Sequence, residues 1–159
     1  MTTCGHCGCE QTECHHCGKP LSNRSESDHR RFFALIRAAF QNWPEQHEFQ
    51  PDDAEHLRAW LLCKAGYRNV TTIPIEDDTT DAMMKLVMLT VEAAIKAAKS
   101  HAFPRVHGHA IYVFTAKSIA FATLPQKAFN EVREAVTEII ELEVGVPADK
   151  LLRGAEQAA

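Results

Sequence analysis

The sequence has no long apolar run and no excess of positive charge. No stretch reaches the roughly 18 consecutive apolar residues of a membrane helix, and the N-terminus is polar and rich in cysteine, unlike a secretory signal. We therefore expect a cytoplasmic protein without a membrane segment. The formal net charge of −4 excludes a generally basic surface for nucleic acid, so any nucleic-acid site must be local.

The signatures of several catalytic sites are also missing. The chain has no glycine-rich phosphate loop, no GxSxG elbow, no HExxH pair and no deaminase signature. His107 and His109, two residues apart in a β-rich run and close to His101, are the only basis for a zinc-dependent nuclease. No carboxylate or cysteine completes a metal site there, so ordinary surface or core histidines explain them better. The sequence thus favours a binding protein over an enzyme.

What is present predicts an α+β fold, with helices packed on a small antiparallel sheet or hairpin. Of the 159 residues, 45% are hydrophobic and 24% are charged, which is typical of a folded, soluble chain. We divide it into a zinc-binding head, residues 1–19, and an α+β domain, residues 20–159. The expected elements of that domain are helices at 24–40, 52–66, 81–99 and 125–145, a strand at 67–75, and a hairpin whose connection is 115–117.

Two cysteine pairs make the head a predicted zinc site. Each pair has the CxxCG spacing, which offers two thiolates from one tight turn, and four thiolates satisfy tetrahedral zinc. A redox dithiol or a disulfide pair is the alternative, although no strand precedes either pair as a redox motif would need. The spare donors Cys9, His6, His15 and His16 leave the ligand set open. The predicted ligands are Cys4, Cys7, Cys14 and Cys17.

The helix over residues 24–40 has an aromatic face and an arginine face. At about 100° per residue, Phe32, Ile36 and Phe40 fall on one side, and Arg30 and Arg37 on the opposite side. Ser25 and Asp28 are typical of an N-cap and its capping-box partner. Exposed guanidinium groups neutralise phosphates, and a nearby aromatic ring can stack a base. The candidate DNA-binding residues are Arg24, Arg30, Arg31 and Arg37, with Lys19 and Lys117 as weaker candidates.

Two further helices have unusual compositions. The helix at 81–99 is apolar across its middle, so we expect burial on more than one side, under a sheet or in a subunit interface. The helix at 125–145 carries Phe129 and Ile140 on one face and an acidic opposite face. The simplest interpretation of that face is solvation. An alternative function is capture and modulation of a host protein through the zinc head and this acidic helix.

The run from Arg24 to Ala34 resembles the signature of the bacteriophage NinB (Orf) recombination proteins. That signature is Arg-Ser, two variable residues, a polar pair, two basic residues, a large apolar residue, an aromatic and Ala; this chain reads RSESDHRRFFA. The Asp-Ala-Glu start at 53–55 and the closing helix after Ser118 follow in similar order. The family's Gln-Asn pair is Asp28-His29 here, its tryptophan is Phe33, and its pattern has no Cys-rich head. A group of phage and prophage proteins with an HRRFFAL helix and a KSIAFA segment is more similar, over roughly residues 20–150.

The resemblance implies a function and partners. A member of this family would be a phage recombination accessory protein in the bacterial cytoplasm, forming a homodimer. It would bind single-stranded DNA without sequence specificity, and act with the host single-stranded-DNA-binding protein and recombinase.

Overall fold

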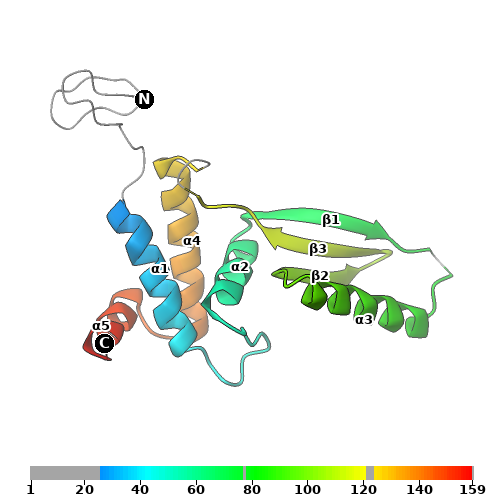
Figure 1. Ribbon diagram of the computed structural model, residues 1–159, viewed down its shortest axis with the longest axis horizontal. Helices are drawn as coiled ribbons and strands as arrows, with labels where there is room; N and C mark the ends of the chain where they lie inside the picture. The colour runs from blue at the N-terminus through cyan, green and yellow to red at the C-terminus, as the bar shows by residue number, and fades with distance from the viewer. Residues whose placement is uncertain (1–25, 77, 121–123, 159) are drawn as a thin grey trace, which may run out of the picture.

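The computed structural model describes residues 26–76, 78–120 and 124–158, and within these ranges the chain is α+β. It has two parts, a helical body and an arm that extends from it (Figure 1). The helical body consists of four helices: α1 (Glu26–Gln41), α2 (Ala54–Lys64), α4 (Gln126–Val144) and α5 (Ala148–Ala158). The arm consists of three strands and one helix: β1 (Arg68–Pro74), α3 (Asp81–Ala97), β2 (Ala102–His107) and β3 (Ala110–Ala116).

The hydrophobic core lies in the helical body, between the inner faces of its helices. Phe32, Ile36 and Ala39 of α1 are buried at the spacing that places them on one helix face. Phe129 and Ile140 of α4 are fully buried opposite them, and the Phe32 and Phe129 rings meet edge to face with centroids 5.5 Å apart. The predicted inner faces of both helices are confirmed. Ser25, the predicted N-cap, lies outside the described residues.

Local capping fixes where α2, α4 and α5 begin or end. Asp53 is the N-cap of α2: its carboxylate accepts a hydrogen bond from the His56 backbone N–H at 2.7 Å. That bond holds the pKa of the Asp53 carboxyl below its usual range. Gly145 ends α4 in the left-handed region at φ 73°, and the Glu141 carboxylate accepts the Ala148 N–H at the start of α5. Helix α5 packs on α1.

The sheet is antiparallel with strand order β1-β3-β2. Pro74 ends β1 at the sheet edge, as its missing N–H predicts. The predicted hairpin connection at 115–117 is wrong, because the turn is Gly108-His109 between β2 and β3. Gly108 has φ 57°, which a two-residue turn of this kind requires and which glycine adopts without a steric cost.

Helix α3 packs against β2 in the arm (Figure 1). The predicted burial on more than one side does not occur within the described chain, since no residue of α3 is buried. Ile111 of β3 is the one buried residue in the described part of the arm. None of the helices within the described ranges has the length and apolar character needed to cross a membrane.

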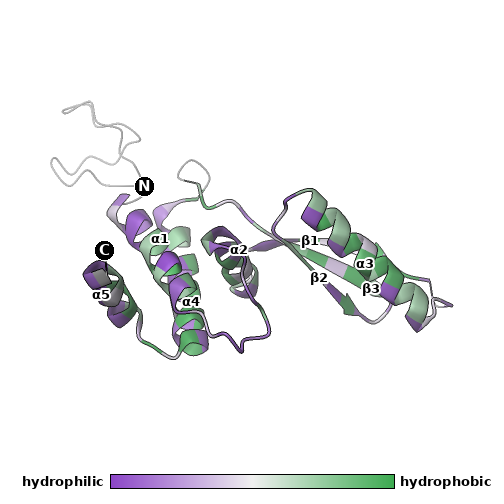
Figure 2. Cartoon of the chain, turned by 60° about the horizontal axis from the view of Figure 1, so that its bottom comes forward, coloured by the Kyte–Doolittle hydropathy of each residue, from purple (hydrophilic) through white to green (hydrophobic). Residues whose placement is uncertain are grey.

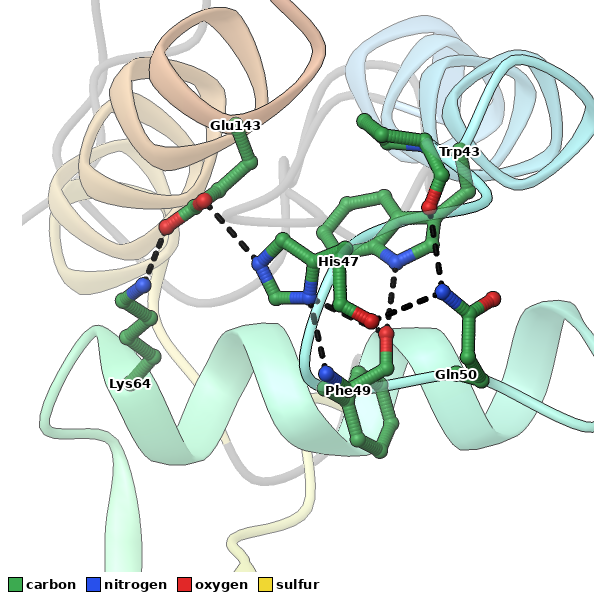
Figure 3. A network of polar contacts seen from close by, with 7 residues as sticks. Trp43, His47, Phe49, Gln50, Lys64 and Glu143 are labelled. Carbon is green, nitrogen blue, oxygen red and sulfur yellow. Dashed lines mark hydrogen bonds and ion pairs between the residues drawn. The ribbon is translucent and has the colours of Figure 1, made fainter.

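A polar network joins the loop after α1 to α2 and α4 (Figure 3). The Trp43 Nε1–H donates to the Phe49 carbonyl at 2.9 Å, and the Phe49 N–H donates to His47 Nδ1 at 2.9 Å. The other ring nitrogen of His47, Nε2, lies 3.0 Å from the Glu143 carboxylate, which also binds the Lys64 ammonium. Lys64, and after it His47, lower the pKa of Glu143 below its ordinary value of 4.5.

We predict that Glu143→Gln makes the chain less sensitive to acid. A carboxylate with a lowered pKa stabilises the fold above its unfolded pKa, and this stabilisation is lost as the pH falls through the lower folded pKa. The free energy of unfolding should therefore decline below about pH 5 in the wild type and decline less in the variant, which should already be about 1–2 kcal/mol less stable at pH 7. Urea unfolding at a series of pH values measures the stability difference at pH 7 and the decline of the free energy of unfolding in acid. Glu138→Gln, on the exposed face of α4, is the matched control and should follow the wild type.

Candidate functional site

The outer face of α1 presents the predicted arginines to solvent. Because the aromatic and aliphatic side chains of α1 turn inward, Arg30, Arg31 and Arg37 are exposed. The predicted outer position of Arg30 and Arg37 on this helix is confirmed, and Arg31 is exposed as well. The other two cationic candidates before α1, Lys19 and Arg24, lie outside the described residues, as do the predicted zinc ligands Cys4, Cys7, Cys14 and Cys17.

These arginines line a groove of about 930 Å³ between α1 and α5, which we call the arginine groove. Arg153 of α5 adds a fourth guanidinium group, and Asp149 and Glu156 are the two carboxylates in the lining. Four cations against two anions give the groove a local formal charge of +2, on a chain whose net charge is −4. The lining residues are His29, Arg30, Arg31, Phe33, Ala34, Arg37, Asp149, Leu152, Arg153 and Glu156.

Two of the four guanidinium groups are paired with the protein's own carboxylates. Arg30 lies 3.2 Å from Glu26, and Arg31 lies 2.5 Å from Asp149. All four side chains in these pairs are more than 60% exposed, so water and salt screen the pairs and a phosphate can compete for either arginine. Arg37 and Arg153 are exposed and form no ion pair within the described ranges.

Phe33 and His29 give the groove a partly exposed aromatic side. Their ring centroids lie 4.7 Å apart, and both side chains are half-buried. The guanidinium carbon of Arg58, from α2, lies 5.9 Å from the Phe33 centroid while Glu55 binds the same guanidinium at 2.8 Å. Rings next to cations in this way are what nucleic-acid bases stack on in single-strand-binding proteins.

Lys117 lies in a smaller hollow that shares Phe33 and His29 with the arginine groove. It is exposed, and its Nζ lies 5.8 Å from the centroid of Tyr67. Thus the aromatic side of the groove connects the α1 arginines to Lys117, which follows β3. Arg153 and Arg58 were missed by the sequence analysis.

The histidines of the arm lie in different elements. His107 is the last residue of β2 and His109 lies in the turn, so they do not share the single strand on which they were placed. The His101 ring instead stacks on His56, with centroids 5.1 Å apart. No group of three or more His, Cys, Asp or Glu side chains in the part of the chain that the structure describes could hold a metal ion.

A second hollow, of about 770 Å³, lies between α2 and the sheet, but its cations are largely engaged. Arg68 stacks over Phe114 at 4.2 Å and donates to the Cys63 carbonyl, and Lys64 binds Glu143. The Cys63 thiol in its wall is buried, and burial raises its pKa to about 11. A protonated, buried thiol is not a nucleophile at neutral pH, so Cys63 acts as a small apolar side chain.

The predicted acidic face of α4 is also present. Glu131, Glu134 and Glu138 are exposed along it, whereas Glu141 caps α5. This surface is available to the alternative function, capture of a host protein.

Comparison of the chain with protein-family models, with curated proteins and with solved structures gives no match.

Proposed function

We propose that this protein binds single-stranded DNA without sequence specificity through the arginine groove, as an accessory factor in phage recombination. The observation that carries the proposal is the gathering of four exposed guanidinium groups, with a net local charge of +2, on a chain that is acidic overall. Guanidinium groups bind phosphate oxygens with two parallel hydrogen bonds. The adjacent Phe33 and His29 rings offer a stacking surface that every base can use.

The proposed complex depends on charge more than on shape. The cationic groups of the lining are arginines, which bind phosphate oxygens, and its aromatic groups are Phe33 and His29, so phosphate neutralisation and stacking supply the affinity. Such binding is moderate in strength and weakens steeply with salt. In this role the protein would act with the host single-stranded-DNA-binding protein and recombinase, as the resemblance to NinB proteins implies. We also propose that Cys4, Cys7, Cys14 and Cys17 hold a structural zinc ion, which metal analysis of the purified protein tests.

Titration of the protein into labelled single-stranded and double-stranded oligonucleotides, followed by fluorescence anisotropy at two salt concentrations, tests the proposal. We expect tighter binding to the single strand, equal affinity for unrelated sequences of one length, and weaker binding at higher salt. No binding to either oligonucleotide at low salt would contradict the proposal. The exposed acidic face of α4 would then be the surface to test against host proteins.

Asp149→Asn should strengthen DNA binding. The substitution removes one of the two carboxylates of the groove and releases Arg31 from its ion pair. One additional guanidinium group able to neutralise a phosphate is worth roughly fivefold in affinity at about 0.1 M salt. The same anisotropy titration measures the gain, and Glu131→Gln on α4 is the control that removes a carboxylate outside the groove. Equal gains in the two variants would mean that only the net charge of the chain matters.

A further inference from the structure

Helix α3 has two apolar stripes on opposite sides, and only one of them has a partner in the described chain. Met84, Met88, Val91 and Ile95 are half-buried and follow the spacing of one helix face, which is the face on β2. On the opposite side, Leu86 and Leu89 are 66% and 63% exposed. In Figure 2 much of the α3 ribbon has the green colour of hydrophobic residues, and the helix lies in the arm, away from the helical body.

The outer stripe has the spacing of a coiled-coil seam. Ala82, Leu86, Leu89 and Ala93 follow one another at intervals of four, three and four residues, the alternation that keeps a stripe facing a second helix. Its two large residues lie at the middle of the helix and its small residues at the two ends. The stripe therefore has nearly the same shape when it is read from either end.

The charges beside this stripe determine which partner fits. Lys85 and Glu92 lie seven residues apart along one edge of the stripe, and Asp81 and Lys96 lie outside them. Read along the helix, the four charges alternate as −, +, −, +, and read in reverse they alternate as +, −, +, −. A second copy of α3 running antiparallel therefore meets an unlike charge at each position, whereas in a parallel pair this edge faces the opposite edge of the partner, which carries the uncharged Met83 and Thr90.

We propose that α3 pairs with α3 of a second copy of this chain, antiparallel and across a two-fold axis. Leu86 of one copy packs on Leu89 of the other, and Lys85 pairs with Glu92 of the other, each contact occurring twice because the interface is isologous. The same symmetry places the small side chain of Ala82 of one copy next to Ala93 of the other. The inference is independent of the proposed DNA binding, because no residue of α3 lines the arginine groove.

The pairing is expected to be of moderate strength. Helix α3 has 17 residues and is about 25 Å long, so a single helix pair buries less than a standard stable interface. We expect a dissociation constant in the micromolar range, roughly 1–50 μM. Further contacts from the exposed edge of the arm would tighten it.

A charge exchange tests the pairing by sedimentation equilibrium of the full chain. Lys85→Glu places two glutamates opposite each other at both symmetric positions, and Glu92→Lys does the same with two lysines. Each single variant should weaken the dimer roughly three- to tenfold, and the double exchange K85E/E92K should restore it to within about twofold of the wild type. Charges that acted only within one helix, at the four-residue spacing of Asp81–Lys85 and Glu92–Lys96, would give losses that add in the double exchange, so recovery of the dimer there identifies a contact between two copies.

Leu86→Glu tests whether the outer stripe forms the dimer contact, and Leu142→Glu is the matched control. Leu142 is 79% exposed on α4, so both variants place the same charge at an exposed leucine of a helix. Leu86→Glu should weaken the dimer more than 30-fold without changing the circular dichroism, and Leu142→Glu should leave the dimer unchanged. A wild type that stays monomeric at 200 μM (about four times the upper end of the expected range), or a dimer that Leu86→Glu and the charge exchange do not affect, would overturn the proposal.

Discussion

Phe129→Ala should lower the free energy of unfolding by about 3–5 kcal/mol, the largest effect of any single substitution considered for this chain. Phe129 is fully buried, and its ring meets that of Phe32 edge to face between α4 and α1. Truncation removes the transfer free energy of a phenyl ring and leaves a cavity that the surrounding helices fill only in part. Because small domains are stable by only about 5–15 kcal/mol, the loss is a large fraction of the total.

Urea denaturation followed by circular dichroism measures this loss, with Leu142→Ala as the control. Leu142 belongs to the same helix and is 79% exposed, so its truncation should change the free energy of unfolding by less than about 0.5 kcal/mol. A loss below about 1 kcal/mol for Phe129→Ala would mean that α1 and α4 do not share the core described above.

The double variant R37A/R153A should bind single-stranded DNA roughly 25-fold more weakly than the wild type at about 0.1 M salt. These are the two groove arginines without a carboxylate partner in the described ranges, one from α1 and one from α5. Each phosphate contact on a single strand contributes about 0.7 to the salt slope, which at this salt concentration is roughly fivefold in affinity. Both side chains are exposed, so the variant should unfold at the temperature of the wild type.

The matched control for this variant is R31A/D149A. It also replaces one residue on α1 and one on α5, but it removes a guanidinium group together with its own carboxylate and leaves the local charge at +2. Its affinity for single-stranded DNA should stay within about threefold of the wild type. Equal losses in the two double variants would indicate that the shape of the α1/α5 surface, and not its charge, determines binding.

The helical body could be predicted from local patterns in the sequence. The spacing of Phe32, Ile36 and Ala39 predicts the buried face of α1, and Asp53 before an apolar run predicts the start of α2. These signals are local, because neighbouring residues alone decide which side chains share a helix face. For the same reason the outer position of Arg30 and Arg37 followed directly from the helical period.

The arm was harder to predict because its register depends on one turn. Apolar and β-branched residues lie on both sides of Gly108 between residues 102 and 116, and this glycine between two histidines was the signal for the turn. The two histidines beside this glycine suggested a metal site instead of a turn. Placing the connection at 115–117 turned β3 into the first strand of a hairpin whose second strand does not occur at Ser118–Ala120.

The residues that complete the arginine groove could be identified only from the tertiary structure. Arg153 joins Arg37 only because Leu151 is buried and holds α5 against α1, and no local pattern states which helix a terminal helix packs on. The composition of α3 correctly signalled an unusual helix, but periodicity alone could not separate a sheet contact from a subunit contact. The structure places one stripe on β2 and leaves Leu86 and Leu89 exposed.

The salt dependence of single-stranded DNA binding tests the central claim most directly. With Arg30, Arg37 and Arg153 on phosphates and Arg31 held by Asp149, a plot of log affinity against log salt concentration should have a slope of about −2.1 for the wild type and about −0.7 for R37A/R153A. A wild-type slope near zero, or a slope that stays the same when Arg37 and Arg153 are removed, would show that the arginine groove does not hold the DNA backbone.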